Sequence, residues 1–271
     1  MAVFSVLLTL SRGQVVAPPP GFKIGSPPKN MEYHESRMFE VRVRTSGISI
    51  TTVSNGYRLT ADQQKRQITV KHQGFQQRMI PGSGTAFLDG ELFAADAGEW
   101  GGALTFLPKN SRQPVVVLQE NVQAVGVIGP NAYVLTGLEH MNISETRIYK
   151  VTRSSGKWQV VPVAVPPEVP RFGSWVGDHF VYAGDIQEVD HGNYRSSSPT
   201  SVKSLALNGE AIMIAKFDCN QFDIRSMVQT RDGIIWFGGL GFVAAVRPGG
   251  KPTFFVPLTG SKPRTGKGRT K

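Results

Sequence analysis

Short turn sequences recur along this chain, each between two apolar or aromatic runs, and they constrain the fold more than any other feature. Five of them are Asn55-Gly56, Asp89-Gly90, Pro130-Asn131, Gly177-Asp178 and Asp232-Gly233. TAFLDGELFAA and GSWVGDHFVYAG illustrate the pattern. Turn residues such as Asn-Gly and Asp-Gly accept the backbone angles of a tight hairpin, so each segment predicts two antiparallel strands.

A second set of turns alternates with the first. It comprises a turn near Lys65-Arg66, then Lys109-Asn110, Ser155-Gly156, Asn208-Gly209 and Gly249-Gly250. From each second turn to the next first turn the interval stays at 21–24 residues (66 to 90, 110 to 131, 156 to 178 and 209 to 233). From a first turn to the following second turn it varies between 10 and 31 residues.

Four-stranded blades packed around an axis explain both intervals. The outer strand of one blade, the connection and the inner strand of the next have a fixed length, whereas the loop between the second and third strands is free to grow. A β-sandwich also has closely spaced turns, but it gives no reason for one interval to stay constant. The sequence therefore predicts an all-β fold, a β-propeller of about five four-stranded blades in a domain of residues 35–258. The expected blades centre on 38–72, 84–118, 123–164, 171–215 and 224–258.

Residues 228–250, VQTRDGIIWFGGLGFVAAVRPGG, carry a resemblance to a known repeat. The segment resembles a blade of the two-component-regulator-type propellers, with the other blades similar in outline. The matching residues are Asp232, Gly233, Ile235, Trp236, Phe237, Gly238, Gly241 and Phe242, while Gly239 stands where that repeat has Thr. The resemblance implies a propeller fold, which serves in sensor ectodomains and in secreted binding proteins.

The N-terminal region predicts export. Residues 1–17 contain a short apolar run, Ala2 to Leu10, and have candidate cleavage positions after Gly13 and after Ala17. We expect a degenerate or truncated signal peptide, hence a secreted or periplasmic protein; an ordinary buried strand, hence a cytoplasmic one, is the alternative. The run is too short to span a bilayer. Residues 18–34 are rich in Pro and Gly and are expected to form a linker without regular structure. The polar stretch 60–67 fits either one helical turn or a hairpin loop.

The formal net charge of +10 owes much to the C-terminal tail. Residues 259–271 contain five cationic side chains, no acid and almost nothing apolar to bury, so we expect a disordered basic tail. Contact with nucleic acid or an anionic surface is the alternative to a solvated tail. Because no aromatic residue interleaves these charges, we expect no specific nucleic-acid partner.

Candidate ligand-binding residues are sought on one face of the propeller, where the loops between second and third strands and the connections between blades open. They are Trp100, Glu99, Arg78, Glu120, Arg171, Asp223, Arg225, Glu139 and His140. Trp100, in GEWGG, is either a ligand anchor or a blade-packing residue. The three arginines either converge on an anionic ligand or pair with acids to seal neighbouring blades.

Catalytic and cofactor motifs are absent from the sequence. It has no nucleophile elbow, zinc-protease motif or phosphate-binding glycine loop, and the acids of 185–190 lack the spacing of a calcium loop. We expect no cofactor and no metal. The sequence predicts a monomeric, non-enzymatic propeller that binds a polysaccharide, an anionic ligand or a protein partner. The alternative is a hydrolase or lyase that acts on a carbohydrate or other anionic substrate through loop-face carboxylates.

Overall fold

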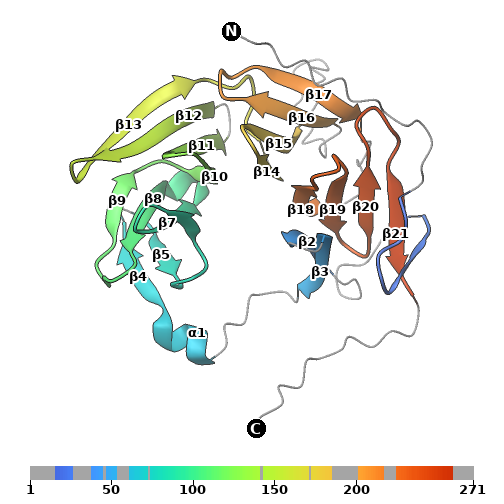
Figure 1. The fold of residues 1–271 in the computed structure, drawn as a ribbon, viewed down its shortest axis with the longest axis horizontal. Coiled ribbons are helices and arrows are strands. Elements are labelled where there is room, and N and C mark those ends of the chain that lie inside the picture. Colours follow the sequence, from blue (N-terminus) through green and yellow to red (C-terminus); the bar gives the residue numbers. More distant parts are fainter. Residues whose placement is uncertain are drawn as a thin grey trace.

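Four β-sheets arranged in an arc around a common axis make up most of the molecule (Figure 1). The computed structural model describes residues 16–26, 38–44, 47–53, 61–72, 74–140, 143–170, 172–184, 201–216 and 224–258. The predicted basic tail, the first fifteen residues and the segment 185–200 lie outside the described residues. The described part contains no helix that is long and apolar enough to cross a bilayer.

Each complete blade runs outward from its first strand to its fourth. The first contains β6 (Thr85–Phe87), β7 (Gly90–Asp96), β8 (Gly102–Pro108) and β9 (Val115–Leu118). The second contains β10 (Val122–Ile128), β11 (Asn131–His140), β12 (Ile143–Ser154) and β13 (Lys157–Ala164). The third contains β14 (Phe172–Val176), β15 (His179–Gly184), β16 (Ser201–Ala206) and β17 (Ala211–Lys216). The fourth contains β18 (Ile224–Gln229), β19 (Ile235–Gly239), β20 (Val243–Val246) and β21 (Thr253–Pro257).

Radial packing of these sheets confirms the predicted β-propeller. Within each sheet consecutive strands pair antiparallel, and the first strands β10, β14 and β18 contact one another around the axis. The bounds of the four sheets agree with the blades expected from residue 84 onward. The protein is therefore an all-β propeller, whereas the particular two-component-regulator type rests on the sequence resemblance alone.

The turns behave as their residues require. Val176 pairs with His179, so Gly177 and Asp178 form a two-residue hairpin turn in which Gly177 has φ +60°. Ser155 and Gly156 both have positive φ and connect β12 to β13. Such primed turns match the twist of the strands that they join. In the four complete blades, the turns of the first set thus lie between first and second strands, and those of the second set lie between third and fourth strands.

Residues 38–72, expected to form a blade, instead contribute to two separate hairpins. β2 (Met38–Arg44) pairs with β3 (Gly47–Val53), and β4 (Ile68–Lys71) pairs with β5 (Gln76–Met79). The helix α1 (Ala61–Arg66) precedes β4, which confirms the helical alternative for that polar stretch.

The two hairpins are held by different blades. β2 packs on β18 and β19, where the Val41 N–H donates to Ser226 Oγ over 2.9 Å. On β5, the Gln77 amide donates to Phe93 O over 3.1 Å and accepts from Thr105 Oγ1 over 2.6 Å, which ties this strand to β7 and β8. The contacts with complete blades explain why these residues do not form one four-stranded sheet.

The segment before β2 also differs from expectation. Phe22–Ile24 form β1, which pairs antiparallel with β21 and gives the last blade a fifth strand. The expectation of no regular structure in 18–34 is therefore wrong for these three residues, because the outer edge of β21 supplies their hydrogen bonds. Val16, just before β1, is buried in a cluster with Phe39 and Trp236.

Candidate functional site

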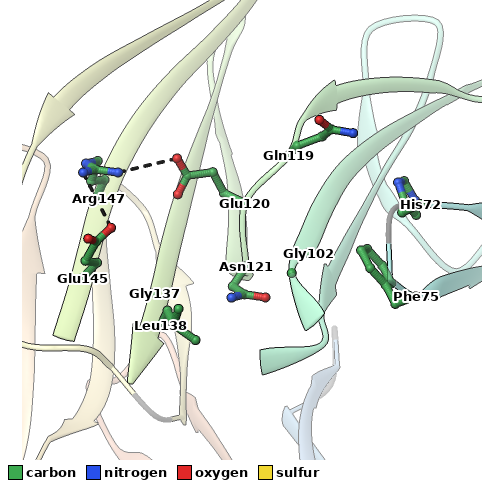
Figure 2. Close-up of a pocket in the computed structure, with 11 residues that line it drawn as sticks. His72, Phe75, Gly102, Gln119, Glu120, Asn121, Gly137, Leu138, Glu145 and Arg147 are labelled. Carbon is green, nitrogen blue, oxygen red and sulfur yellow. Dashed lines mark ion pairs between the residues drawn. The ribbon is translucent and has the colours of Figure 1, made fainter. Parts of the chain in front are cut away.

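A pocket of about 400 Å³ lies at the boundary between the β6–β9 and β10–β13 blades (Figure 2). The tip of the β4–β5 hairpin forms part of its wall. We call it the inter-blade pocket, and it is lined by His72, Phe75, Gly101, Gly102, Gln119, Glu120, Asn121, Gly137, Leu138, Glu145 and Arg147. In Figure 2 the side chains of Glu120, Glu145 and Arg147 lie on one side of this pocket, and His72 and Phe75 lie on the other.

The charged side is a row of three residues with arginine in the middle. Arg147 Nη1 lies 3.6 Å from Glu120 Oε1, and Arg147 Nη2 lies 3.8 Å from Glu145 Oε2. Glu145 and Arg147 are two residues apart on β12, and alternate residues of a strand share one face. Glu120 approaches from the connection between β9 and β10. Within the described residues, no group of three acidic, histidine or cysteine side chains is placed to hold a metal ion.

Tyr149, two residues further along β12, supports this row from the core. It is buried, and its phenol donates a 2.8 Å hydrogen bond to Glu120 Oε1. Burial and then this bond raise the pKa of Tyr149, so the phenol stays a donor. Hydrogen bonding with Tyr149, followed by the charges of Tyr149 and Glu120, raises the pKa of the exposed Arg147 guanidinium. Tyr149 therefore fixes the position of Glu120, the acid at one end of the row.

Asn121 fixes the bottom of the pocket. Its side chain is buried, donates to Gly98 O over 2.8 Å and accepts a 3.4 Å hydrogen bond from the Ala97 N–H. The backbone carbonyl of Asn121 accepts a 2.9 Å hydrogen bond from the N–H of Gly137 in β11. Close packing also requires glycine at position 102, where a Cβ would lie 2.5 Å from Asn121 Cα.

The aromatic side is a stacked pair at the hairpin tip. The rings of His72 and Phe75 lie 4.5 Å apart between centroids with planes 12° from parallel. His72 Nε2 lies 3.2 Å from Gln77 Oε1, the buried amide that anchors β5 to its neighbours. Gly74, which precedes Phe75 in the turn of this hairpin, has φ +87°, and a Cβ there would lie 3.0 Å from Trp100 O. The tip therefore packs closely against the turn that carries Trp100.

Among the nine residues predicted from the sequence, Glu120 lines the inter-blade pocket. Trp100 ends the 3-10 turn Gly98–Trp100, beside the lining residue Gly101, and 64% of Trp100 is exposed. Glu99 lies in the same turn. Glu139 and His140 follow the lining residue Leu138 in β11. They lie in a strand and not in a loop, because the pairing of β11 with β12 continues to His140 and Ile143.

The predicted arginines are spread over the fold. Arg78 is exposed and lies in β5 opposite Thr69, not in a connection between blades. Arg225 lies in β18. Arg171 and Asp223 lie outside the described residues. The proposed convergence of Arg78, Arg171 and Arg225 on an anion stays a prediction.

Most of the pocket was not predicted. Glu145, Arg147 and Tyr149 are alternate residues of the segment ETRIYK, with Thr146 and Ile148 between them. That alternation was a usable signal, since it places the three polar residues on one face of a strand. His72 and Phe75 carried no comparable signal, because their role depends on which blade receives the hairpin.

The next blade boundary repeats the same type of contact. Glu168, on the connection before β14, accepts a 2.7 Å hydrogen bond from the Tyr182 phenol. Lys203 Nζ lies 2.7 Å from Glu168 Oε1 and 2.8 Å from Glu168 Oε2. Burial, and then Glu168, raise the pKa of Tyr182. At both boundaries an acid from the connection is bound by a tyrosine and a cation of the following blade.

The fold and the pocket together define a β-propeller with a polar and aromatic pocket between two of its blades. No protein-family model matches the chain, and no curated protein matches it. Among solved structures, TolB from Acinetobacter baumannii is similar over 83% of this chain, with 10% sequence identity and a TM-score of 0.31. The match covers 64% of the TolB chain, less than two thirds of its length. At this identity and score the comparison carries no argument about function.

Proposed function

We propose that the protein is a non-enzymatic binding propeller and that a carbohydrate segment occupies the inter-blade pocket. The observation that carries this proposal is the row Glu120–Arg147–Glu145 facing the stacked pair His72–Phe75 across about 400 Å³. A sugar ring has hydroxyl groups at its edge and C–H groups on its faces. Planar carboxylate, guanidinium and amide groups bind the hydroxyls in pairs, and an aromatic ring packs on the C–H face.

The size and rigidity of the pocket support a small ligand site. Its volume lies in the range of about 300–1,000 Å³ that is typical of such sites. Tyr149 holds Glu120, and Asn121 holds the turn at Gly98, before any ligand arrives. A binding site that is ordered in advance loses less conformational entropy when it binds.

Trp100 extends the proposed site beyond the pocket. It is exposed, it follows directly on the candidate residue Glu99, and it precedes the lining residue Gly101. A chain of sugars longer than the pocket would cross this indole and stack on it. We therefore propose a polysaccharide as the ligand, with Trp100 as its second aromatic contact.

The other candidate ligands and the enzymatic alternative have less support from the pocket. The two carboxylates of the lining repel an anionic ligand, and Arg147, its cation, is already paired with both of them. Paired-carboxylate hydrolysis needs two carboxyl groups that flank the scissile bond, one as acid and one as base or nucleophile. Glu120 and Glu145 both lie on one side of the pocket, beside Arg147, so we propose binding without hydrolysis.

We also propose that the protein is exported after cleavage following Gly13. Residues 2–10 are mainly apolar, and of the two candidate cleavage positions only this one retains Val16, a buried residue of the last blade's core. Expression with the native N-terminus, cell fractionation and N-terminal sequencing test this. Mature protein beginning at Gln14 outside the cytoplasm is the expected result, and uncleaved cytoplasmic protein would contradict it.

A glycan array followed by calorimetry tests the binding proposal. Wild-type protein is expected to retain at least one class of oligosaccharide, and Phe75→Ala to weaken its binding by about tenfold or more, a loss of about 1.4 kcal/mol. The matched control is Ile212→Ala, an exposed apolar side chain on β17. The proposal fails if no glycan binds, if Phe75→Ala binds like wild type, or if bound oligosaccharides are cleaved.

A further inference from the structure

The charges that line the inter-blade pocket do not cancel. Glu120 and Glu145 bring two negative charges, Arg147 brings one positive charge, and the other lining residues are uncharged when histidine is counted as neutral. This surplus of negative charge is opposite in sign to the formal net charge of the whole chain, which is +10. We propose that the pocket selects a sugar that carries a free, protonated amino group over its neutral and acidic counterparts. This inference rests on the carbohydrate function proposed above.

The geometry of the row leaves one carboxylate available to such a ligand. The two Arg147 contacts of 3.6 and 3.8 Å are longer than the roughly 2.7–2.9 Å of a charge-assisted hydrogen bond. The Glu120 side chain is 30% exposed and already accepts the Tyr149 hydrogen bond, whereas the Glu145 side chain is 62% exposed. Glu145 is therefore the carboxylate that receives the ligand's ammonium group.

The opposite side of the pocket suits the same ligand. The Phe75 ring packs on the C–H face of the sugar whose ammonium group binds Glu145 on the other side. The amides of Gln119 and Asn121 line the pocket beside the row, and Gln119 offers a donor and an acceptor to sugar hydroxyls. A carboxylate on the sugar would meet Glu120 and Glu145 and be repelled.

Three oligosaccharides of equal length separate the possibilities. They are a glucosamine oligomer with free amino groups, its fully N-acetylated form and a uronic acid oligomer, each titrated calorimetrically against the full chain. At about pH 7, where the formal charges counted above apply and amino groups with a pKa of about 8 are mostly protonated, the free-amine oligomer is expected to bind at least about tenfold more tightly than either of the others. Its affinity is expected to fall as salt is added, because an exposed charge pair is screened.

Glu145→Gln is expected to remove the preference for the free amine and to retain binding of the N-acetylated oligomer. Glu210→Gln removes the same charge from the exposed turn after β16 and is expected to leave the preference unchanged. Melting temperatures of both variants should equal that of wild type, since both side chains are exposed.

The outcomes distinguish this inference from the function on which it rests. If all three oligomers fail to bind while another glycan of the array binds, the charge selection alone is overturned; if no glycan of the array binds either, both are overturned. If the N-acetylated or the acidic oligomer binds as tightly as the free-amine one, or if the preference survives Glu145→Gln, the charge selection is overturned and the carbohydrate function stands.

Discussion

The phenol of Tyr149 donates a 2.8 Å hydrogen bond to Glu120 and thereby joins the third strand of one blade to the connection that enters it. Tyr182 donates to Glu168 in the same way at the next boundary, over 2.7 Å. An acid of the connection is bound by a cation as well in both places, by Arg147 and by Lys203. These contacts hold the connections between blades, which are the segments that form the proposed ligand face.

Breaking the second of these contacts is expected to destabilise the fold. The Lys203 and Glu168 side chains are only 21% and 14% exposed, so Lys203→Met leaves a poorly solvated carboxylate without its cation. We expect a loss of about 3 kcal/mol in the free energy of unfolding, measured by urea denaturation. The double variant Glu168→Gln/Lys203→Met should recover part of this loss. An equal loss in the single and double variants would show that the charge of Glu168 is not the cause.

Alkaline conditions test the tyrosine of the same contact. Burial raises the pKa of Tyr182 above the ordinary value of 10.0. The unfolded chain therefore releases this proton at a lower pH than the folded chain does. The resulting stability is complete below about pH 10 and is lost as the pH rises from there towards the higher pKa of the folded state. Unfolding titrations of wild type and Tyr182→Phe between about pH 9 and 11.5 should show a steeper decline in wild type. Parallel declines would contradict the prediction.

Substitutions of Trp100 and Trp236 distinguish the effect of losing an exposed tryptophan from that of losing a buried one. Trp100 is 64% exposed, whereas Trp236 is 7% exposed and stacks on Phe255 with ring centroids 5.7 Å apart. Trp236→Ala should cost about 3–5 kcal/mol of stability. Trp100→Ala should leave the melting temperature nearly unchanged and weaken binding of a long oligosaccharide. A large, equal loss of stability in both variants would remove Trp100 from the proposed site.

A single methyl group is expected to disturb the bottom of the inter-blade pocket. In Gly102→Ala the new Cβ would lie 2.5 Å from Ala95 O, Glu120 O and Asn121 Cα, all of them backbone atoms with little freedom to move. Both the melting temperature and ligand affinity should fall. Gly156→Asn is the control: this position has φ +77° with nothing within 4 Å of a Cβ, and asparagine tolerates such angles. Wild-type behaviour of Gly102→Ala would contradict the close packing described above.

Limited proteolysis tests the loop between the second and third strands of the third blade. The segment 185–200, which lies outside the described residues, joins β15 to β16 and is expected to be the longest loop. Its sequence, DIQEVDHGNYRSSSPT, is too polar to supply a continuous buried strand. Protease should therefore cut first within it and leave the four blades folded. Mass spectrometry of the first fragments identifies the cut, and initial cleavage elsewhere would count against this assignment.

The blades from residue 84 onward were predictable because local chemistry defines them. Ser155-Gly156 and Gly177-Asp178 specify tight turns, and apolar runs on both sides supply the strands. The region 38–72 was not predictable in the same way. Its arrangement depends on distant partners, Ser226 for Val41 and Thr105 for Gln77, that no local pattern reveals.

The same distinction between local sequence and distant contacts applies to the residues of the pocket. Glu120 could be found, because a connection between blades is identified by counting residues between turns. Arg147 lies inside an expected strand, where a charge is usually a solvated side chain. The stacking surface of Phe75 exists only because Gln77 anchors its hairpin beside β7 and β8.

The strands that β1 and β2 contact are synthesised near the end of the chain. β1 pairs with β21, and β2 packs on β18 and β19, all of which are translated more than 170 residues after β2. While the ribosome makes the intervening blades, β1 and β2 lack these partners in the last blade, and their apolar side chains remain available to other chains. Folding chaperones that protect nascent chains would thus act chiefly on the beginning of this polypeptide, and the last blade can be completed only once its end has emerged.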